Sequence, residues 1–340
     1  MRRVVALGEL LLRLRAPGAE RLLQGAALEA TYGGAEFNVL ASLARFGLTT
    51  DFVTALPEEG LGPSALGAIR QHGIGSGNVE RSAGRLGLYF LEAGSGVRSG
   101  RVIYDRAESV FARIDPGVFD WPAILRGADW LHLTGITPAV SESAARIAYA
   151  AADAAVARGV PVSLDINMRV QLWKLSGREA FPALAPLLRR SKIVFATPGD
   201  WAACIRPSQH RPSEAANEFA AFAATLFDEY PAVEVLVAGT RRGSSAADFD
   251  VGAIAQRRGA TQIVATEIAV RSATEGVGGG DALVGGCLFG LLAGWPDERW
   301  LEFGVTARAV KHTIPGDVNL ISLAEIETVL RGRTASDLVR

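Results

Sequence analysis

A glycine-rich run ending in one carboxylate, at residues 274–284, is the part of the chain best suited to chemistry. It reads TEGVGGGDALV. Glycines contribute no side chains to a core, but they let backbone amides approach a ligand closely. The apolar run 282–292 is long enough for a helix, so the glycines would lie at its N-terminus. Unpaired N–H groups and the helix dipole favour a bound anion there.

Asp281 is unexpected in such a site, because a carboxylate repels a bound phosphate. General-base chemistry on a group that attacks the phosphate is one reason to place it there. The sequence therefore predicts an anion site at this helix N-terminus, formed by the amides of Gly278, Gly279 and Gly280, with Asp281 as the base.

Length and composition describe an ordinary globular protein and exclude several functions. The 340 residues are 49% hydrophobic and 21% charged, which allows an ample core. A net charge of −1 offers no electrostatic footprint for nucleic acid or an anionic membrane. The longest apolar run, 282–296, is too short and too rich in glycine to span a bilayer. We therefore expect neither nucleic acid nor a membrane as a partner.

The cysteines and the remaining glycines exclude further classes. Cys204 and Cys287 are far apart and suggest neither a disulfide framework nor a zinc site, as expected of a reduced, cytoplasmic protein. No glycine-rich stretch is followed by Lys-Ser or Lys-Thr, which excludes a P-loop. Gly33-Gly34 precedes a helical pattern with Asn38 in its first turn, which indicates either a second backbone-lined polar site or a plain turn into a helix.

Predicted strands and helices alternate along most of the chain, which implies a mostly parallel, doubly wound α/β sheet. The strands are expected at 4–7, 51–56, 130–133, 160–165, 193–196 and 233–237, and the helices at 35–46, 64–71, 141–158, 215–228 and 282–292. Residues 10–32 and 86–112 do not fit this alternation. Their alternating, partly polar stretches predict a small β lid beside the sheet, within one domain that covers residues 1–340.

Five segments resemble the ribokinase-like (PfkB) sugar kinases. GGAEFN at 33–38 is similar to the sugar-binding glycine pair of that family, and GGGD at 278–281 to its anion hole and catalytic aspartate. Three more resemble the 2-keto-3-deoxygluconate kinases: LYFLE with VIYDR within 88–106, DINMR with LWK within 165–174, and KHTIPGDVN at 311–319. The segments occur in the family's order over essentially the whole chain.

The resemblance implies a fold and a reaction. It implies a ribokinase-like fold with the nucleotide-binding part at about 190–340. Asp281 would remove the proton from a sugar hydroxyl as this hydroxyl attacks the γ-phosphate of ATP. The glycine amides would hold the charge that builds on the transferred group. Mg²⁺ bridging the phosphates is implied as well, and a monovalent cation such as K⁺ is compatible with the family.

The resemblance also implies which residues bind each ligand. A guanidinium suits the carboxylate of a sugar acid, whereas ribose and fructose carry none. The substrate-binding residues would be Glu9, Gly33, Gly34, Asn38, Tyr89, Tyr104, Arg106, Arg169, Asp281 and Asp317. The nucleotide would contact Asn167, Thr240, Arg241, Gly243, Gly278 and Gly280, with residues 240–243 in a loop after the strand 233–237, and Asp200 would bind the metal indirectly.

Three positions depart from the family pattern. Relatives usually carry Asp before the anion hole, whereas this chain has Glu275 followed by Gly276. Thr197 stands in place of the Asn of a family motif that organises the water around magnesium. The sequence predicts an ATP-dependent kinase for the terminal hydroxyl of 2-keto-3-deoxygluconate or a close sugar acid. The alternatives are a fructokinase- or ribokinase-like enzyme for a neutral sugar and a weakly catalytic, sugar-binding regulatory protein. An exposed β lid further predicts a homo-oligomer.

Overall fold

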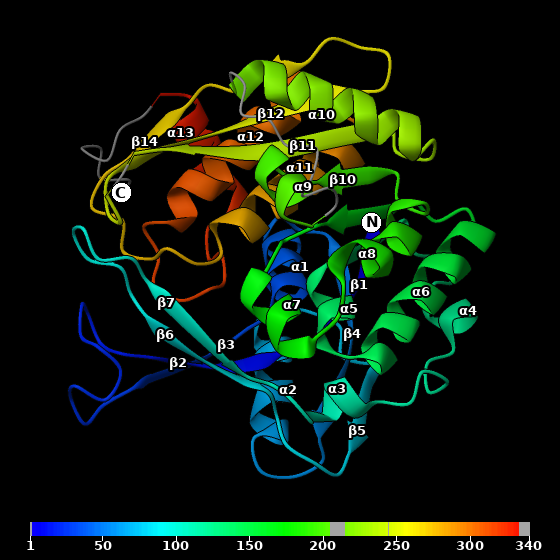
Figure 1. Cartoon of the computed structure of the whole chain (residues 1–340), viewed down its shortest axis with the longest axis vertical. Coiled ribbons are helices and arrows are strands. Elements are labelled where there is room, and N and C mark those ends of the chain that lie inside the picture. The colour runs from blue at the N-terminus through cyan, green and yellow to red at the C-terminus, as the bar shows by residue number, and fades with distance from the viewer. Residues whose placement is uncertain (1, 205–214, 244, 333–340) are drawn as a thin grey trace.

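The computed structural model describes residues 2–204, 215–243 and 245–332. A ten-stranded sheet lies between two layers of helices, and a four-stranded sheet projects to one side, at the lower left of Figure 1. In spatial order the main sheet contains β13 (Ile263–Val264), β12 (Phe249–Arg257), β11 (Val235–Arg242), β10 (Ile193–Phe195), β9 (Val162–Asp165), β8 (Trp130–Thr134), β1 (Arg3–Leu7), β4 (Thr49–Pro57) and β5 (Val79–Ser82), and β14 (Ile268–Val270) pairs with β12.

Most of this sheet is parallel, as the alternation of strands and helices predicts. The pairs from β11 to β5 are all parallel, whereas β12 runs antiparallel to β11, β13 and β14. Successive residues of each central strand point to opposite faces, and both faces are covered. In β1, Val5 and Leu7 join the core on one face, while Val4 and Ala6 join the core on the other. This is why the strands read as continuous apolar runs.

The helices divide between the two faces. Helices α3 (Val110–Arg113), α4 (Trp121–Ile124), α5 (Ile136–Val140), α6 (Glu142–Ala157), α7 (Val170–Ser176), α8 (Ala180–Leu188) and α10 (Ala215–Glu229) contribute to one core. Helices α1 (Ala35–Arg45), α2 (Gly62–Gln71), α11 (Gly279–Leu292), α12 (Asp297–Lys311) and α13 (Leu323–Leu330) contribute to the other. The short α9 (Pro198–Cys204) follows β10.

Glycines in α11 decide how closely it packs against its neighbours. A Cβ on Gly285 would lie 2.8 Å from the Cβ of Ser42 in α1, and one on Gly286 would lie 2.7 Å from the Cα of Gly304 in α12. Such distances allow no side chain at these positions. The absence of side chains lets α11 approach both helices, and it brings the first turn of α11 against the first turn of α1.

The small sheet is the predicted lid. Its strand order is β3 (Glu29–Gly33), β2 (Leu11–Arg15), β6 (Leu88–Glu92) and β7 (Arg101–Asp105). The outer pairs are antiparallel and the central pair β2–β6 is parallel. All four strands fall within or adjoin the predicted ranges 10–32 and 86–112. The end of the second range does not belong to the lid, because Val110 and Phe111 of α3 are buried in the core of the main sheet.

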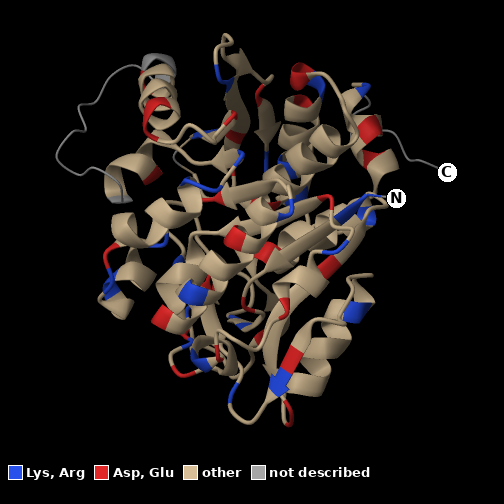
Figure 2. Cartoon of the chain, turned by 90° about the vertical axis from the view of Figure 1, so that its right-hand side faces the viewer, with Lys and Arg blue, Asp and Glu red and all other residues tan. Residues whose placement is uncertain are grey.

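Acidic and basic residues are mixed across the face drawn in Figure 2, in agreement with the net charge near zero. Within the described residues, no helix is both long enough and apolar enough to cross a membrane.

Candidate active site

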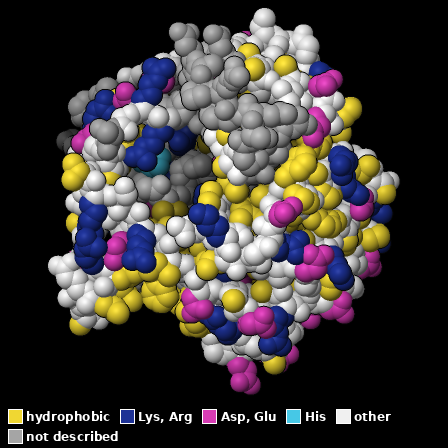
Figure 3. Space-filling view, in the orientation of Figure 1, with side chains coloured by type: hydrophobic (Ala, Val, Ile, Leu, Met, Phe, Trp, Pro, Cys, Tyr) yellow, Lys and Arg dark blue, Asp and Glu magenta, His cyan; other side chains and the backbone are white. Residues whose placement is uncertain are grey.

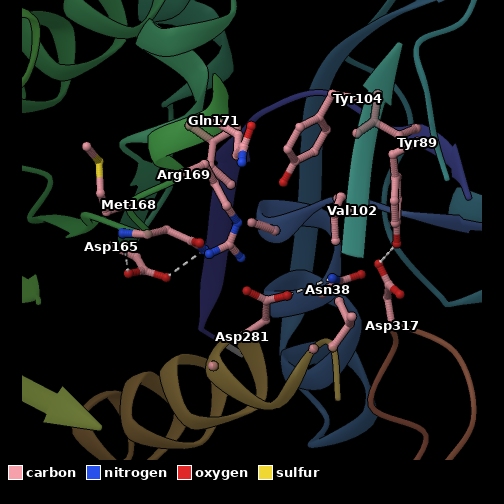
Figure 4. A pocket seen from close by; sticks show the side chains of 18 of the residues that line it. Asn38, Tyr89, Val102, Tyr104, Asp165, Met168, Arg169, Gln171, Asp281 and Asp317 are labelled. Carbon is pink, nitrogen blue, oxygen red and sulfur yellow. Dashed lines mark hydrogen bonds between the residues drawn. The ribbon is translucent and has the colours of Figure 1, made fainter. Parts of the chain in front are cut away.

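A cavity of about 690 Å³ opens between the lid and the carboxyl ends of the parallel strands. In open α/β sheets ligands bind at this edge. Figure 4 shows side chains converging on the cavity from the lid, from α1, from the segment after β9 and from the N-terminus of α11. Its lining includes most of the predicted site residues: Glu9, Gly34, Asn38, Tyr89, Tyr104, Arg106, Asn167, Arg169, Asp200, Gly278, Gly279, Gly280, Asp281 and Asp317.

The glycine run forms a helix N-terminus, as predicted. Gly278 is the N-cap residue of α11 with φ +82°, a conformation that favours glycine, and Asp281 lies in the first turn. The first N–H groups of a helix have no intrahelical acceptor, so the residues that follow Gly278 bring free amide donors to the cavity that they line. Asn38, in the first turn of α1, donates from Nδ2 to Oδ2 of Asp281 at 2.7 Å. Its Oδ1 is buried and has no hydrogen-bond partner among the described residues.

The surroundings of Asp281 raise the pKa of its carboxyl toward neutral pH. Burial raises the pKa of the carboxyl from 3.8 to about 6, and the charges of Asp317 and Glu36 act in the same direction. The hydrogen bond from Asn38 and the charge of Arg169 oppose this rise. A carboxyl with a pKa near 6 is ionised at neutral pH and still accepts a proton readily, as a general base must.

A second carboxyl, that of Asp165 at the end of β9, lies near Asp281. Burial, together with the charges of Asp281 and Asp200, raises its pKa to about 8, against the opposing charge of Arg169 and the hydrogen bond from the backbone of Asn167. Asp165 accepts hydrogen bonds from the backbone N–H and from Nδ2 of Asn167, both at 3.0 Å. Asn167 has φ +41°, which is uncommon for a residue with a side chain, and these two bonds hold it there.

Thr197 and Asp200 form a local pair at the start of α9. The backbone N–H and the hydroxyl of Thr197 donate to Oδ2 of Asp200 at 2.8 and 2.6 Å, and the N–H of Asp200 donates back to Oγ1 at 3.1 Å. The threonine that replaces the family's asparagine therefore caps the helix and orients Asp200, which lines the cavity.

Two arginines reach the cavity in different ways. Arg106 is buried and ion-paired to Glu9, with its Nε and Nη2 at 2.7 and 2.5 Å from Oε2. Arg169 makes no ion pair with any carboxylate in the described part of the chain, and Figure 4 shows its guanidinium pointing into the cavity toward Asp281. Burial lowers its pKa, but Tyr104, Asp281 and Asp165 outweigh that effect and the net pKa is raised. Arg169 is therefore a charged group open to an anionic ligand.

Asp317 is held from two sides of the lid. Its Oδ1 accepts from Arg13 in β2, and its Oδ2 accepts from the hydroxyl of Tyr89 in β6. Gly33 lies against the same carboxylate, because a Cβ there would overlap Oδ2. The loop that carries Asp317 is fixed by the buried Lys311, whose Nζ donates to the carbonyls of Ile314 and Gly316 at 3.0 and 2.7 Å.

The predicted nucleotide residues Thr240, Arg241 and Gly243 do not line the cavity. The expectation that all three lie in a loop after 237 is wrong for Thr240 and Arg241. Pairing with β12 continues β11 to Arg242, and Gly243 (φ +120°) follows the strand. The Arg241 guanidinium lies 3.8 Å from the ring centre of Phe249.

Aromatic contacts connect Arg241 to the N-terminus of α11, and Arg308 and Lys311 lie near the same contacts. Phe249 is in edge contact with His312, and a Cβ on Gly279 would overlap the His312 ring. Arg241 is thus two side chains away from the N-terminus of α11. Burial, together with the charges of Arg308, Lys311 and Arg241, lowers the pKa of His312 to about 4. Figure 3 shows Lys and Arg side chains around a hollow whose floor carries a histidine.

Several residues of the site were not assigned a role from the sequence. Asp165, Lys311 and His312 lie inside segments that resemble the family and could have been selected by type alone. Arg13 carries no local signal, since an arginine within the alternating LLRLR of β2 reads as a solvent-facing position. Its burial is revealed only by the partners that the fold brings to it, Glu275 and Asp317.

The doubly wound sheet, the β lid and the aspartate at a glycine-rich helix N-terminus together define a ribokinase-like kinase. The chain belongs to the pfkB family of carbohydrate kinases, whose model matches residues 1–320. It is therefore an ATP-dependent sugar kinase, most similar to kinases of 2-dehydro-3-deoxy sugar acids.

Two relatives are similar over nearly their whole length. A crystal structure of the 2-dehydro-3-deoxygluconokinase of Thermotoga maritima is 33% identical with a TM-score of 0.91, covering 98% of this chain and 100% of that one. The 2-dehydro-3-deoxygalactonokinase of Haloferax volcanii is 31% identical over 98% of both chains. A putative ribokinase II from E. coli, solved with ATP and Mg²⁺, is 17% identical with a TM-score of 0.80, covering 98% of this chain and 100% of that one, and shows the shared fold.

Proposed function

We propose that the enzyme transfers the γ-phosphate of ATP to the terminal hydroxyl of 2-keto-3-deoxygluconate (2-dehydro-3-deoxygluconate) or a close sugar acid. The observation that carries the proposal is the pairing of Asp281 with Asn38 at the glycine-rich N-terminus of α11, with Arg169 pointing toward them in the same cavity. A base, an anion site and a cation that pairs with no carboxylate of the described residues thus face one space. The names of the relatives support the same class of substrate.

In this proposal Asp281 accepts the proton of the attacking hydroxyl. The hydroxyl oxygen forms a bond to the γ-phosphorus, the bond from this phosphorus to the bridging oxygen breaks, and ADP leaves. The amides of Gly278, Gly279 and Gly280 stabilise the charge on the transferred group. The unpartnered Oδ1 of Asn38 is placed to accept a hydrogen bond from the sugar, since its amide nitrogen is already bonded to Asp281.

Arg169 is proposed to bind the carboxylate of the sugar acid. Arg106 is less free, because Glu9 already engages two of its nitrogens, and it is proposed to contact the sugar with its remaining N–H donors. Tyr104 and Tyr89 of the lid, together with Asp317 and Gly33-Gly34, form the sugar side of the cavity in this proposal.

ATP is proposed to extend from the α11 N-terminus toward Asn167, Thr240, Arg241 and Gly243. Cations near this path favour a polyphosphate. No three His, Cys, Asp or Glu side chains among the described residues are placed to hold a metal. Asp165 and Asp200 offer the oxygen ligands that Mg²⁺ prefers, and they would hold it beside the phosphates, largely through water. Bound Mg²⁺ would neutralise charge on the phosphates.

Release of ADP with a panel of sugars tests the proposal. The panel contains 2-keto-3-deoxygluconate, 2-keto-3-deoxygalactonate, fructose and ribose, each with wild type and with Asp281→Asn. Turnover is expected with one or both acids, and Asp281→Asn is expected to lower kcat at least 100-fold because the base is lost. Arg169→Gln should raise the KM for the acid about tenfold or more, with a much smaller effect on the KM for any neutral sugar.

Each alternative has its own outcome in this assay. Turnover of neutral sugars alone would exclude the carboxylate role of Arg169. Sugar binding without any turnover would favour a regulatory protein. Full activity in Asp281→Asn would show that the base is a different residue.

A further inference from the structure

A buried arginine, Arg13, connects the lid with both loops that border the anion site. Its Nη1 is hydrogen-bonded and ion-paired to Oδ1 of Asp317, and its Nη2 to Oε2 of Glu275. Arg13 is 1% exposed, and the two carboxylates are 4% and 3% exposed. The three residues come from β2, from the loop before α11 and from the loop after α12, and they meet only in the folded chain.

Glu275 transmits this contact to the backbone of the anion site. Its other oxygen, Oε1, accepts from the N–H groups of Gly276 and Val277 at 2.9 and 3.2 Å. These two residues lead directly into Gly278. The carboxylate that Arg13 holds therefore fixes the path of the chain into the helix N-terminus.

Asp317 makes a second connection to the same point. Its carbonyl oxygen lies where a Cβ on Gly278 would be, so the two backbones are in direct contact. Its side chain also receives the hydroxyl of Tyr89, a lid residue that lines the cavity. A movement of the lid strands thus reaches Gly278 through each carboxylate. Arg15 of β2 also contacts Glu275, with Nη1 3.5 Å from Oε2, and Tyr89 contacts Asp317, but Arg13 contacts both carboxylates and so joins the two routes.

Stability alone does not explain this cluster. Taking charges out of water is costly, and a buried ion pair is often no more stabilising than apolar residues of the same volume. The guanidinium fork holds two carboxylates in a fixed relative geometry, which a point charge such as an ammonium does not do. In an enzyme with two substrates, a fixed geometry between a strand on the sugar side and a loop of the anion site can link the binding of one substrate to that of the other.

We propose that Arg13 is a positioning residue that couples sugar binding in the lid to the conformation of the anion site. Sugar that orders β2 and β6 fixes Arg13, which in turn fixes Glu275 and the backbone of residues 276–278 for the phosphate. This inference rests on the proposed function, because it assumes a sugar under the lid. It requires that each substrate increase the affinity for the other by the same factor.

Titration calorimetry measures this factor directly. The Kd of a non-hydrolysable ATP analogue is determined with and without a saturating sugar acid that the panel identifies as bound. Wild type is expected to bind the analogue at least fivefold more tightly with the sugar. Arg13→Lys keeps the positive charge but loses the forked guanidinium. In this variant the increase in affinity caused by the sugar should be less than twofold, and kcat should be at least tenfold lower than in wild type. Each ligand alone should still bind within about threefold of wild type.

Two variants separate coupling from folding. Arg85→Lys makes the same change at an exposed ion pair with Asp105, the last residue of the lid strand β7, and should keep the wild-type factor. The double variant Arg13→Met with Glu275→Gln leaves fewer unpaired buried charges than Arg13→Met alone, because the carboxylate of Glu275 is removed as well. Provided that it folds, it should also lose the coupling.

The outcomes distinguish this inference from the proposed function. Wild-type coupling retained in folded Arg13→Lys, or no coupling in wild type, would overturn the role of Arg13 alone. Failure of wild type to bind any sugar acid would overturn the proposed substrate, and coupling would then be measured with the sugar that is bound.

Discussion

At the scale of single residues, the pKa of Asp281 sets the expected pH dependence. With a pKa of about 6, Asp281 is protonated below this pH and cannot accept a proton, so kcat/KM should fall as pH drops through 6. Asn38 stabilises the ionised form by donating to it, so Asn38→Ala should raise the pKa. We expect the acid limb of the profile to move upward by roughly half to one pH unit.

The matched control for this prediction lies one turn further along α1. Ser42 donates to the carbonyl of Asn38 at 3.1 Å and makes no hydrogen bond to Asp281. Ser42→Ala should therefore leave the midpoint of the acid limb unchanged. If the midpoint in Asn38→Ala stays at the wild-type value while kcat falls, Asn38 contacts substrate without adjusting the base.

At the scale of elements, the start of α11 allows a comparison between two neighbouring glycines. Gly278→Ala places a Cβ at φ +82° and against the carbonyl of Asp317, so it must displace the anion-site backbone. It should lower kcat at least 100-fold, the size of effect seen when one oxyanion donor is removed, and should also lower Tm.

Gly280→Ala is the matched change two residues later. Nothing lies within 4 Å of its Cβ position, its φ is not positive, and alanine favours a helix. Its Tm should equal or exceed that of wild type, while kcat falls because a methyl group enters the cavity. The measurements are thermal unfolding and ADP release for both variants. A Gly278→Ala protein with wild-type Tm and kcat would contradict the role given to this backbone.

The same elements show what the sequence can and cannot predict. The central strands and the helix after the glycine run were predictable, because each is a largely apolar run in the sequence. The extension of β11 through Thr240 and Arg241 was not, because it depends on pairing with β12. Strand ends that a partner determines carry no signal in their own residues.

At the scale of the whole molecule, residues within the segments that resemble the family were easier to predict than residues between these segments. Most of the predicted sugar-side residues meet in one cavity, since strand ends of a parallel sheet share an edge. Arg13 was missed because the carboxylates that pair with it lie more than 250 positions away in the sequence. A buried charge in a strand is understood only when the fold supplies its counter-charges.

The free energy of unfolding should depend on pH through the ionisation of Asp281. Its folded pKa of about 6 lies above the unfolded value of 3.8, so ionisation disfavours the folded state increasingly as pH rises between these values. Asp281→Asn removes this cost. The variant should be more stable than wild type by about 3 kcal/mol at pH 8 and by roughly half of that at pH 5. In a chain of this length the difference at pH 8 amounts to roughly 4 °C in Tm.

Thermal unfolding of both proteins at pH 5 and pH 8 measures this difference, and Asp228→Asn provides the control. Asp228 is exposed near the end of α10, and its replacement should change stability by no more than about 0.5 kcal/mol at either pH. Asp281→Asn that is less stable than wild type at pH 8 would mean that the carboxylate stabilises the fold. Greater stability together with lost turnover would show that the enzyme keeps a destabilising charge because catalysis requires it.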